Sequence, residues 1–284
     1  MNIGINYKYK DDFQDYCKNF IEKNNIKHLE INWYKHDCLN KEYEDEYLKQ
    51  IQFLKDTYNI KFSLHFPTFY DFGSRIPFFR YIIKEHLKEC LTYANSFGID
   101  LIVIHPGTIG QMDIPKNNRF ASQRLLLDIA HSKKNEVRKL SLEIFDFIKS
   151  EIEKNNYKLK IAIENLVLDN EICVKSKDLI SLIKDIKSDS FGACLNYAHA
   201  HRAGQDLIEY TNEVKDYLLH IHVSDNDGKC DLHSFPEAEG CTLPWDDIFN
   251  VLQEIQYNNS IIAEVVSENI ETLNFTVNFL KTNK

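Results

Sequence analysis

Short, mostly apolar runs recur along the chain and alternate with longer segments in which apolar residues return at helical spacing. Short runs rich in Ile, Leu and Val are typical of parallel strands that are buried on both faces. Eight runs are expected to form strands: Asn2 to Asn6, His28 to Asn32, Lys61 to His65, Leu101 to His105, Lys160 to Glu164, Gly192 to Asn196, Leu218 to Val223 and Ser260 to Val265. This alternation predicts successive βα units.

Three of the intervening segments show the amphipathic pattern of helices clearly, over residues 81–98, 137–154 and 268–282, and Gly98 supplies a stop signal for the first. The chain has only 6 prolines and 9 glycines, and no low-complexity stretch interrupts the alternation. We therefore expect an α/β fold, a (β/α)8 TIM barrel that forms a single domain over residues 1–284. Two connections are expected to be long, Pro106 to about Asn135 and Ser224 to about Pro244.

Polar residues close six of the strand-like runs: His65, His105, Glu164, Asn196, His222 and Glu264. In a (β/α)8 barrel the carboxyl ends of all strands meet at one mouth, so these side chains are expected to converge there. His199, Asp231 and His233 follow strand ends closely and extend the set. Imidazole and carboxylate donors favour zinc, manganese, iron or cobalt over magnesium. The pattern therefore predicts a divalent metal site.

The composition of the chain limits the classes of function that it can have. The formal charge is −9, from 34 basic and 43 acidic residues, which gives no electrostatic footprint for nucleic acid or an anionic membrane. The seven cysteines are odd in number and form no CxxC pair, which favours reduced thiols over disulfides or a thiolate zinc site. Neither an apolar leader nor a membrane span is evident. These features indicate a soluble, cytoplasmic protein that has no membrane partner.

The motifs at the strand ends, in their order along the chain, resemble the xylose isomerase-like TIM-barrel superfamily, which contains sugar isomerases and epimerases as well as endonuclease IV. They are LHFP at 64–67, IHPGT at 104–108, IENL at 163–166, CLNYAHA at 194–200, HVSDNDG at 222–228, DLH at 231–233 and AEV at 263–265. In the isomerases and epimerases, one metal is held by residues that match Glu164, Asn196, His222 and Glu264. The resemblance implies that Glu164 and Glu264 also transfer the proton.

Endonuclease IV-like enzymes, the AP endonuclease family 2 branch, resemble the chain at nine metal-binding positions. These positions match His65, His105, Glu164, Asn196, His199, His222, Asp231, His233 and Glu264, and Asn196 alone departs in residue type from the family's aspartate. An amide offers one neutral oxygen where a carboxylate offers a charge and a second oxygen. We therefore expect one or two divalent ions per chain, zinc or manganese, rather than a full three-metal cluster.

Three further residues are interpreted as substrate contacts. Glu30 ends the second strand in HLEIN, and Phe69 and Tyr70 lie in the aromatic stretch after His65. His220 shares the inward face of its strand with His222 but lies one layer deeper, which favours a role in the core. The segments after Glu164 and His222 do not match the sugar-contacting patterns of ketohexose epimerases, so the substrate stays open.

The leading interpretation is a metal-dependent isomerase or epimerase acting on a sugar, sugar phosphate or related polyol. The main alternative is an endonuclease IV-like phosphodiester hydrolase, against which stand the net charge, Asn196 and the scarcity of basic residues in the loops after the second and third strands. A third interpretation is a non-catalytic barrel that binds a ligand or serves as an assembly subunit. The expected partner is a sugar-like small molecule; nucleic acid is disfavoured, and a homo-oligomer is left open.

Overall fold

Eight parallel strands form a closed barrel in which each strand pairs with its neighbour in sequence and β8 pairs with β1. The computed structural model describes residues 1–33, 41–108, 122–168 and 170–283, with the backbone alone at residues 41 and 122–132. The strands are β1 (Asn2–Tyr7), β2 (His28–Asn32), β3 (Lys61–His65), β4 (Leu101–Ile104), β5 (Lys160–Glu164), β6 (Phe191–Asn196), β7 (Leu218–Val223) and β8 (Ser260–Ala263). The predicted (β/α)8 barrel is confirmed.

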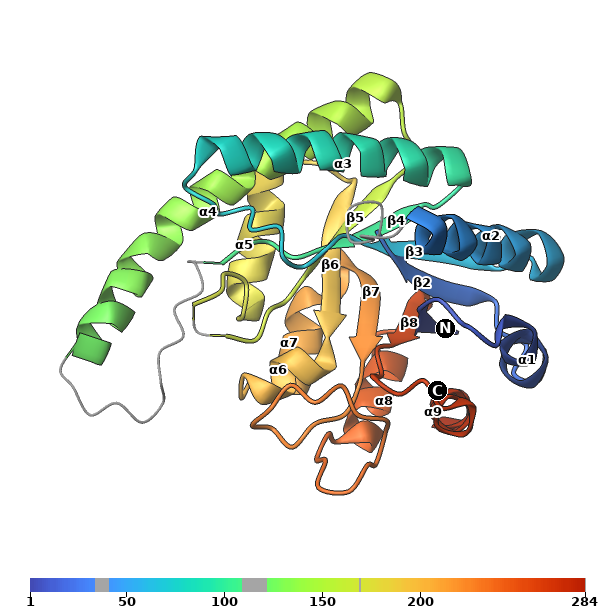
Figure 1. Ribbon diagram of the computed structural model, residues 1–284. Helices are drawn as coiled ribbons and strands as arrows, with labels where there is room; N and C mark the ends of the chain where they lie inside the picture. Colours follow the sequence, from blue (N-terminus) through green and yellow to red (C-terminus); the bar gives the residue numbers. More distant parts are fainter. Residues whose placement is uncertain (34–40, 109–121, 169, 284) are drawn as a thin grey trace.

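Helices follow the strands and surround the barrel (Figure 1). They are α1 (Phe13–Tyr16), which continues into a π-helical turn (Cys17–Glu22), α2 (Lys41–Tyr58), α3 (Pro77–Phe97), α4 (Ser122–Asn155), α5 (Ser176–Ile186), α6 (Tyr197–Arg202), α7 (Leu207–Val214) with a 3-10 turn (Lys215–Tyr217), α8 (Trp245–Glu254) and α9 (Ile270–Asn283). None of the helices in the described ranges has the length and apolar character needed to cross a lipid bilayer.

The structure confirms one predicted helix boundary and corrects another. Gly98 ends α3 in the left-handed conformation, with φ of 79°, as its position in the pattern indicates. The connection after β4 was expected to run to about Asn135, but this was wrong because α4 already begins at Ser122. Residues 122–135 contain neither Gly nor Pro, so nothing in their backbone opposes an earlier helix start.

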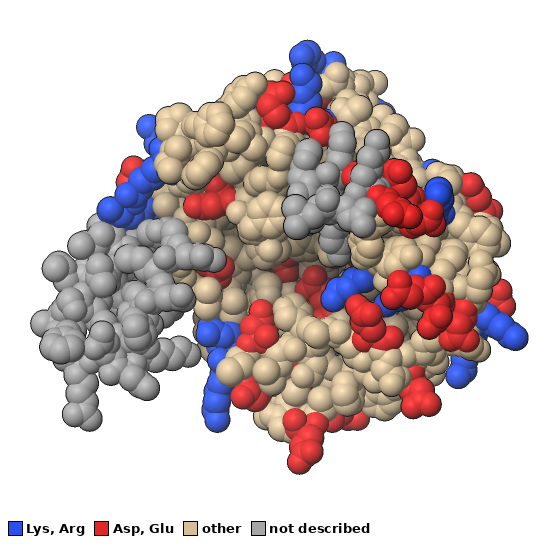
Figure 2. Space-filling model, viewed as in Figure 1, with Lys and Arg blue, Asp and Glu red and all other residues tan. Residues whose placement is uncertain are grey.

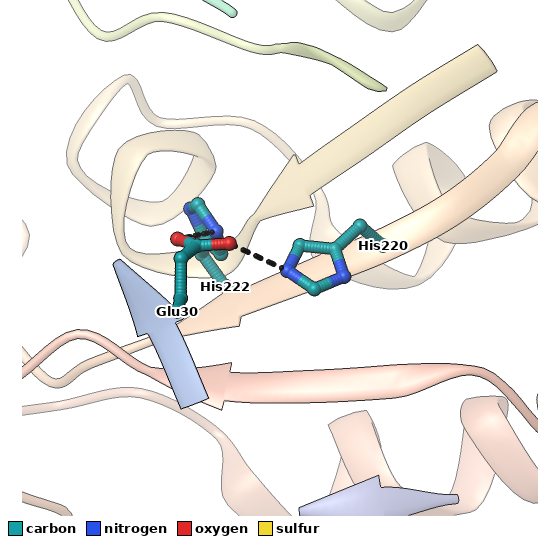
Figure 3. A group of neighbouring side chains, drawn as sticks. All are labelled: Glu30, His220 and His222. Carbon is teal, nitrogen blue, oxygen red and sulfur yellow. Dashed lines mark hydrogen bonds and ion pairs between the residues drawn. The ribbon is translucent and has the colours of Figure 1, made fainter. Parts of the chain in front are cut away.

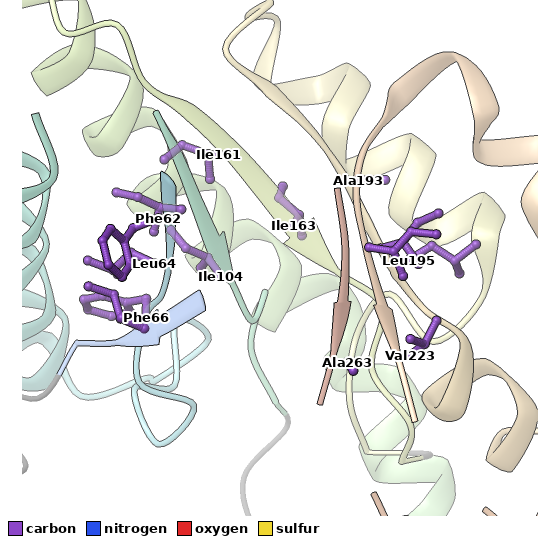
Figure 4. Close-up of a cluster of buried hydrophobic side chains, with 14 of the residues drawn as sticks. Phe62, Leu64, Phe66, Ile104, Ile161, Ile163, Ala193, Leu195, Val223 and Ala263 are labelled. Carbon is purple, nitrogen blue, oxygen red and sulfur yellow. The ribbon is translucent and has the colours of Figure 1, made fainter. Parts of the chain in front are cut away.

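Successive residues of each strand face opposite sides of the barrel wall. The outward set, which includes Phe62, Leu64, Ile161 and Ile163, packs in the hydrophobic core between barrel and helices (Figure 4). The inward set is divided: one apolar cluster lies on neighbouring strands and contains Val103, Ala162 and Cys194, while the remaining interior is largely polar. Barrel interiors are usually filled by branched apolar side chains, so a polar interior marks this half of the barrel for function.

Gly4 on β1 is required by the closeness of the neighbouring strands. A Cβ atom at this position would lie 2.5 Å from the carbonyl oxygen of His28 and 2.7 Å from Cδ1 of Ile262. Since real Cβ atoms do not approach backbone this closely, only glycine allows β1 to sit between β2 and β8 at this level.

Candidate metal centre

Glu164 lies at the centre of the barrel mouth, at the end of β5, and is 1% exposed. Its Oε2 lies 3.1 Å from Nε2 of His65 and 2.9 Å from Nε2 of His105. Its Oε1 lies 3.1 Å from Nδ1 of His222. One carboxylate thus joins residues from β3, the end of β4 and β7, as expected for side chains that leave parallel strands at the same end.

Glu264 contacts the same nitrogen of His222. Its Oε2 lies 3.3 Å from Nδ1 of His222, so both glutamates face one nitrogen atom. Ligand atoms of His65, His222 and Glu264 all lie within 4.8 Å of one another, and so do those of His65, His105 and Glu164. These separations are short enough for each group to surround a single ion.

Asn196 connects the two glutamates. Its Nδ2 donates hydrogen bonds to Oε1 of Glu164 at 2.8 Å and to Oε2 of Glu264 at 3.0 Å, while its Oδ1 accepts from the backbone N–H of His199 at 3.2 Å and caps α6. The neighbours fix this orientation, because the reversed amide would set its oxygen against two carboxylates and its NH2 against an N–H. Position 196 therefore presents a donor to the carboxylates rather than a ligand oxygen.

A second group lies at the outer side of the mouth. Oδ2 of Asp231 is 3.5 Å from Nε2 of His199 and 3.3 Å from Nε2 of His233, and the ligand atoms of all three lie within 4.8 Å of one another. Nδ1 of His199 is 3.6 Å from Oε1 of Glu164, so the outer group adjoins the inner one. The structure thus brings together all nine candidate ligands from the sequence.

The loop that carries Asp231 and His233 is fixed by Asp225, a buried residue just after β7. Its Oδ1 accepts from the backbone N–H groups of Asn226 and Leu243, and its Oδ2 accepts from the N–H of Glu237 and the indole N–H of Trp245 at 2.7 Å. Four donors on one carboxylate tie both ends of the 224–244 connection together, which places the outer group over the mouth.

Contacts between carboxylates and histidines in the inner group shift the pKa values of both. Burial disfavours the carboxylate form of Glu164, but the charges of His222 and His105 outweigh it and hold the pKa of Glu164 well below its usual range. Burial likewise lowers the pKa of His65, yet the hydrogen bond and charge of Glu164 raise that pKa to about 9. The site is therefore built to hold carboxylates in their charged form, which is the form that binds cations.

In the outer group, too, contacts between opposite charges outweigh the effect of burial on the pKa values. Burial raises the pKa of Asp231, but hydrogen bonds from His199 and His233 outweigh this and lower it. Burial lowers the pKa of His233, and Asp231 and Glu264 together raise it to about 9. Positive charge is thus favoured at two separate places in the mouth, beside Glu164 and beside Asp231.

A cavity of about 780 Å³ opens above these groups and is lined by His65, His105, Glu164, His199 and Glu264 among other residues. Figure 2 shows the hollow in this face of the molecule, with acidic side chains in its depth. The described residues that line the cavity include Asp71, Glu171 and Asp231 but no lysine or arginine. A volume of this size fits a small-molecule ligand.

The three residues interpreted as substrate contacts lie in different places. Phe69 is 62% exposed and lines the cavity. Tyr70 instead stacks on Phe66, with ring centroids 5.1 Å apart, and its hydroxyl contacts His86 of α3, so it lies beside the cavity rather than in its wall. Glu30 is buried below the mouth, in contact with His222, and is not among the residues lining the cavity.

The donor set fits a divalent cation. Imidazole nitrogens and carboxylate oxygens converge in the groups described above, and the carboxylates are held ionised at buried positions. A buried carboxylate needs a compensating charge, and in the described wall of the cavity only histidines supply one. The residues that would hold an ion are His65 and His105 with Glu164, His222 with Glu264, and His199 and His233 with Asp231.

Cys194 is not among the residues that the strand-end pattern predicts for the site. It lies two residues before Asn196 on the inward face of β6, is buried, and has its Sγ within 4.8 Å of ligand atoms of Glu164 and His222. The strand period of two would have revealed this position, because residues two apart share a face. The absence of a CxxC pair does not bear on a cysteine that meets its partners across strands.

Comparisons with known proteins agree with this architecture. The family model of the xylose isomerase-like TIM barrel matches residues 19–282. A crystal structure of a D-tagatose 3-epimerase-like protein is similar over 100% of this chain and 97% of its own, with a TM-score of 0.77 and 20% identity. D-psicose 3-epimerase from Clostridium cellulolyticum H10 is similar over 98% and 89%, with a TM-score of 0.67 and 16% identity. At these identities the likeness shows the fold.

Two sequence relatives add further context. An uncharacterised protein of Methanocaldococcus jannaschii is 24% identical over 222 residues, which are 76% of this chain and 68% of the relative. A protein named probable endonuclease 4, of Mycoplasma capricolum, is 29% identical over 119 residues, only 37% of this chain and 41% of that protein. Because the family model spans most of the barrel, the chain belongs to the xylose isomerase-like TIM barrel family.

Proposed function

We propose that the protein is a metal-dependent isomerase or epimerase that acts on a sugar or a related polyol, with Glu164 and Glu264 as the two residues that transfer the proton. One observation carries the proposal: Oε1 of Glu164 and Oε2 of Glu264 face the same two atoms, Nδ2 of Asn196 and Nδ1 of His222, at 2.8 to 3.3 Å. Two carboxylates that meet at a shared point suit proton removal and return at one substrate carbon.

The chemistry follows from two carboxylates that are ionised before substrate arrives. The pKa of Glu264 is lowered, because His222 outweighs the effect of burial, so its carboxylate can accept a proton from a carbon next to a carbonyl group. The electrons of that C–H bond pass into an enediolate. A bound divalent ion would polarise the carbonyl and stabilise this negative charge. The other glutamate would relay a proton from water to the carbon from the opposite side, and Glu264 would then release its own proton to solvent.

The cavity favours a neutral substrate over a phosphorylated one. Its described wall offers five carboxylates and several hydroxyl and amide groups, but no lysine or arginine to neutralise a phosphate. Carboxylate oxygens accept hydrogen bonds from sugar hydroxyl groups, and the exposed ring of Phe69 provides an apolar surface at the rim. We therefore propose an unphosphorylated keto sugar or polyol-derived ketone as the substrate class.

Solvent exchange tests the proposal. The protein loaded with Mn²⁺ or Zn²⁺ is incubated in D2O with neutral ketoses and their phosphates, and deuterium next to the carbonyl is followed by NMR. Incorporation into a neutral sugar is expected, and Glu264→Gln should lower its rate about 10²- to 10⁴-fold. Glu151→Gln, which changes a glutamate on α4 outside the barrel mouth, should leave the rate unchanged. Failure of the whole panel with metal-loaded protein counts against the proposal.

A second candidate, phosphodiester hydrolysis, is favoured by the outer group of His199, Asp231 and His233, which proton transfer between the glutamates does not use. Several metal positions in one mouth suit activation of water and stabilisation of a leaving oxygen. Nicking of a duplex that contains an abasic site, abolished by chelator and restored by metal, would support this candidate. Purified protein that holds no metal, with Glu264→Gln silent in both assays, would support a non-catalytic barrel.

A further inference from the structure

The histidines of the mouth do not all present the same nitrogen to the site. Nδ1 of His65 lies 2.8 Å from the backbone oxygen of Phe66, Nδ1 of His199 lies 2.9 Å from that of Asn165, and Nδ1 of His233 lies 3.0 Å from that of Glu264. Since a backbone carbonyl only accepts, each of these Nδ1 atoms carries the proton. Nε2 is then the nitrogen left for a ligand in all three rings.

His222 is turned the other way. Its Nδ1 faces Glu164 and Glu264, and its Nε2 points down into the barrel, where the side chain is completely buried. In the part of the chain that the structure describes, Nε2 has no hydrogen-bond partner, but it forms an ion-pair contact with Oε1 of Glu30, 2.9 Å away. Figure 3 shows Glu30 reaching from β2 toward both His222 and His220 of β7.

Glu30 is held in place by a chain of hydrogen bonds that crosses the barrel interior. Its Oε2 accepts from Ser63 at 2.8 Å and lies 3.0 Å from Nε2 of His220. Oγ of Ser63 is 3.0 Å from Nε2 of His28, and Oγ of Ser260 is 2.7 Å from Nδ1 of His28. Every proton in this chain has an acceptor if Glu30 is ionised and Ser260 donates to His28, so an ionised Glu30 is compatible with the whole network.

This arrangement places the negative charge of Glu30 directly beside Nε2 of His222. Glu30 is only 2% exposed, yet both of its oxygens face donors: Oε2 accepts from Ser63 and lies beside Nε2 of His220, and Oε1 lies 2.9 Å from Nε2 of His222. An ionised carboxylate on Nε2 makes the opposite nitrogen of an imidazole a better donor to a cation. The backbone oxygens behind the other three histidines carry no full charge, so His222 is distinct in this respect.

We propose that Glu30 is a positioning residue of the metal centre: it holds the proton of His222 on Nε2 and aims Nδ1 at the ion. The inference rests on the proposed function in one respect, that a divalent ion is bound beside Glu164 and Glu264. In this proposal Glu30 lies behind the metal ligands and does not contact the substrate. The polar half of the barrel interior then serves to hold Glu30 in place. Partners of this kind change metal affinity about 10- to 100-fold.

Glu30, His220 and the Nε2 atom of His222 also lie within 4.8 Å of one another, so this group could itself surround an ion. The hydrogen bonds through Ser63 and His28 favour the positioning role, because they account for the protons on these atoms without a cation. The two assignments differ in the number of ions bound per chain, which can be counted directly.

The test measures Zn²⁺ affinity by competition with a chromophoric chelator, with metal content counted after dialysis. Glu30→Gln keeps the shape and one acceptor oxygen but removes the charge, and a roughly tenfold loss of affinity is expected; Glu30→Leu removes both, and a loss of up to about 100-fold is expected. Ser63→Ala, which removes one supporting hydrogen bond to Glu30, should have a smaller effect. Glu151→Gln is the matched control for loss of a buried glutamate, and no change is expected.

A second readout does not depend on the variants folding. In wild-type protein loaded with Zn²⁺ and labelled with ¹⁵N-histidine, NMR should show His222 protonated on Nε2 and ligated through Nδ1, with the reverse for His65, His199 and His233. His222 protonated on Nδ1, or unchanged affinity in both Glu30 variants, overturns the inference. Loss of one whole ion per chain in Glu30→Gln also overturns it, since Glu30 would then be a ligand. If wild-type protein binds no metal, the proposed function fails first.

Discussion

Nδ2 of Asn196 donates a hydrogen bond to Oε1 of Glu164 at 2.8 Å, and the same nitrogen reaches Glu264 at 3.0 Å. The amide thus relieves the repulsion between two carboxylates at a position where the resemblance to endonuclease IV-like enzymes implies an aspartate. A donor at this point and a ligand at this point are mutually exclusive, because an amide NH2 has no lone pair to give to a cation. The residue at position 196 therefore decides whether this position can supply a ligand to a metal ion.

Asn196→Asp should make the protein less stable without metal and more avid for metal. The aspartate can still cap α6 by accepting from His199, but it replaces a donor with a third carboxylate, so the metal-free form should lose about 1–3 kcal/mol of unfolding free energy. Zn²⁺ affinity should rise at least about tenfold. Urea unfolding in chelator and metal titration measure the two effects.

Asn226→Asp is the matched control for this change, since Asn226 is also buried and its Nδ2 donates only to a backbone oxygen, that of Ala198 at 2.8 Å. It should lower stability without raising metal affinity. A variant at position 196 that is as stable as wild type in chelator would show that the hydrogen bonds to the glutamates contribute little.

Metal removal should destabilise the wild-type protein. Glu30, Glu164 and Glu264 are concentrated around His222, and an ion bound to the folded form alone adds free energy of unfolding by mass action. At free metal about 100-fold above its dissociation constant the gain is about 2.7 kcal/mol. Thermal unfolding with chelator, and then with Zn²⁺ or Mn²⁺ restored, measures it. An unchanged unfolding temperature would argue against a resident ion.

Asp225→Asn should loosen the 224–244 connection. The amide would turn NH2 toward the indole N–H of Trp245 or toward backbone donors, leaving donors unpaired at a buried position, at a cost of about 1–3 kcal/mol. Faster proteolysis of this connection is expected, together with weaker metal binding by Asp231 and His233. Asp227→Asn changes a partly exposed aspartate in the same connection; its Oδ1 accepts from the N–H groups of Lys229 and Cys230 and can still do so as an amide oxygen, so neither property should change.

His28, which is buried in the barrel interior, should make the free energy of unfolding depend on pH. Burial is the main reason that the pKa of His28 is lowered to about 4, with His220 and Lys61 acting in the same direction and Glu30 against them. In the unfolded chain the pKa returns to about 6.5. As pH falls, His28 of the unfolded chain is therefore protonated before His28 of the folded protein. This contribution to the free energy of unfolding is fully present above pH about 6.5 and is lost progressively as pH falls toward about 4.

The size of this effect is up to roughly 3 kcal/mol, from about 1.4 kcal/mol for each pH unit between the two pKa values. His28→Gln removes the titrating group. The difference in unfolding free energy between wild type and variant should change by this amount between pH 7 and pH 4, measured by denaturant titration at each pH. A difference that is constant across this range would mean that His28 titrates normally in the folded protein.

Much of the fold follows from the chain pattern alone, and so does the location of the site. Apolar runs that end in His65, Glu164 or Asn196 specify buried parallel strands, and parallel strands in a closed barrel must bring their carboxyl ends together. For this reason residues nearly 200 positions apart could be placed in one mouth. The period of two also places Cys194 and His220 inside the barrel, one layer below the ligands.

What the sequence determined by itself is which residues face the mouth; what only the tertiary structure decided is how each of them is turned. Strand parity sets the side of the sheet, but the nitrogen that His222 presents depends on Glu30, and the orientation of Asn196 depends on two glutamates and a helix start, all contributed by other segments. Hydrogen-bond partners from distant strands carry no local signal, because their geometry exists only once the barrel closes.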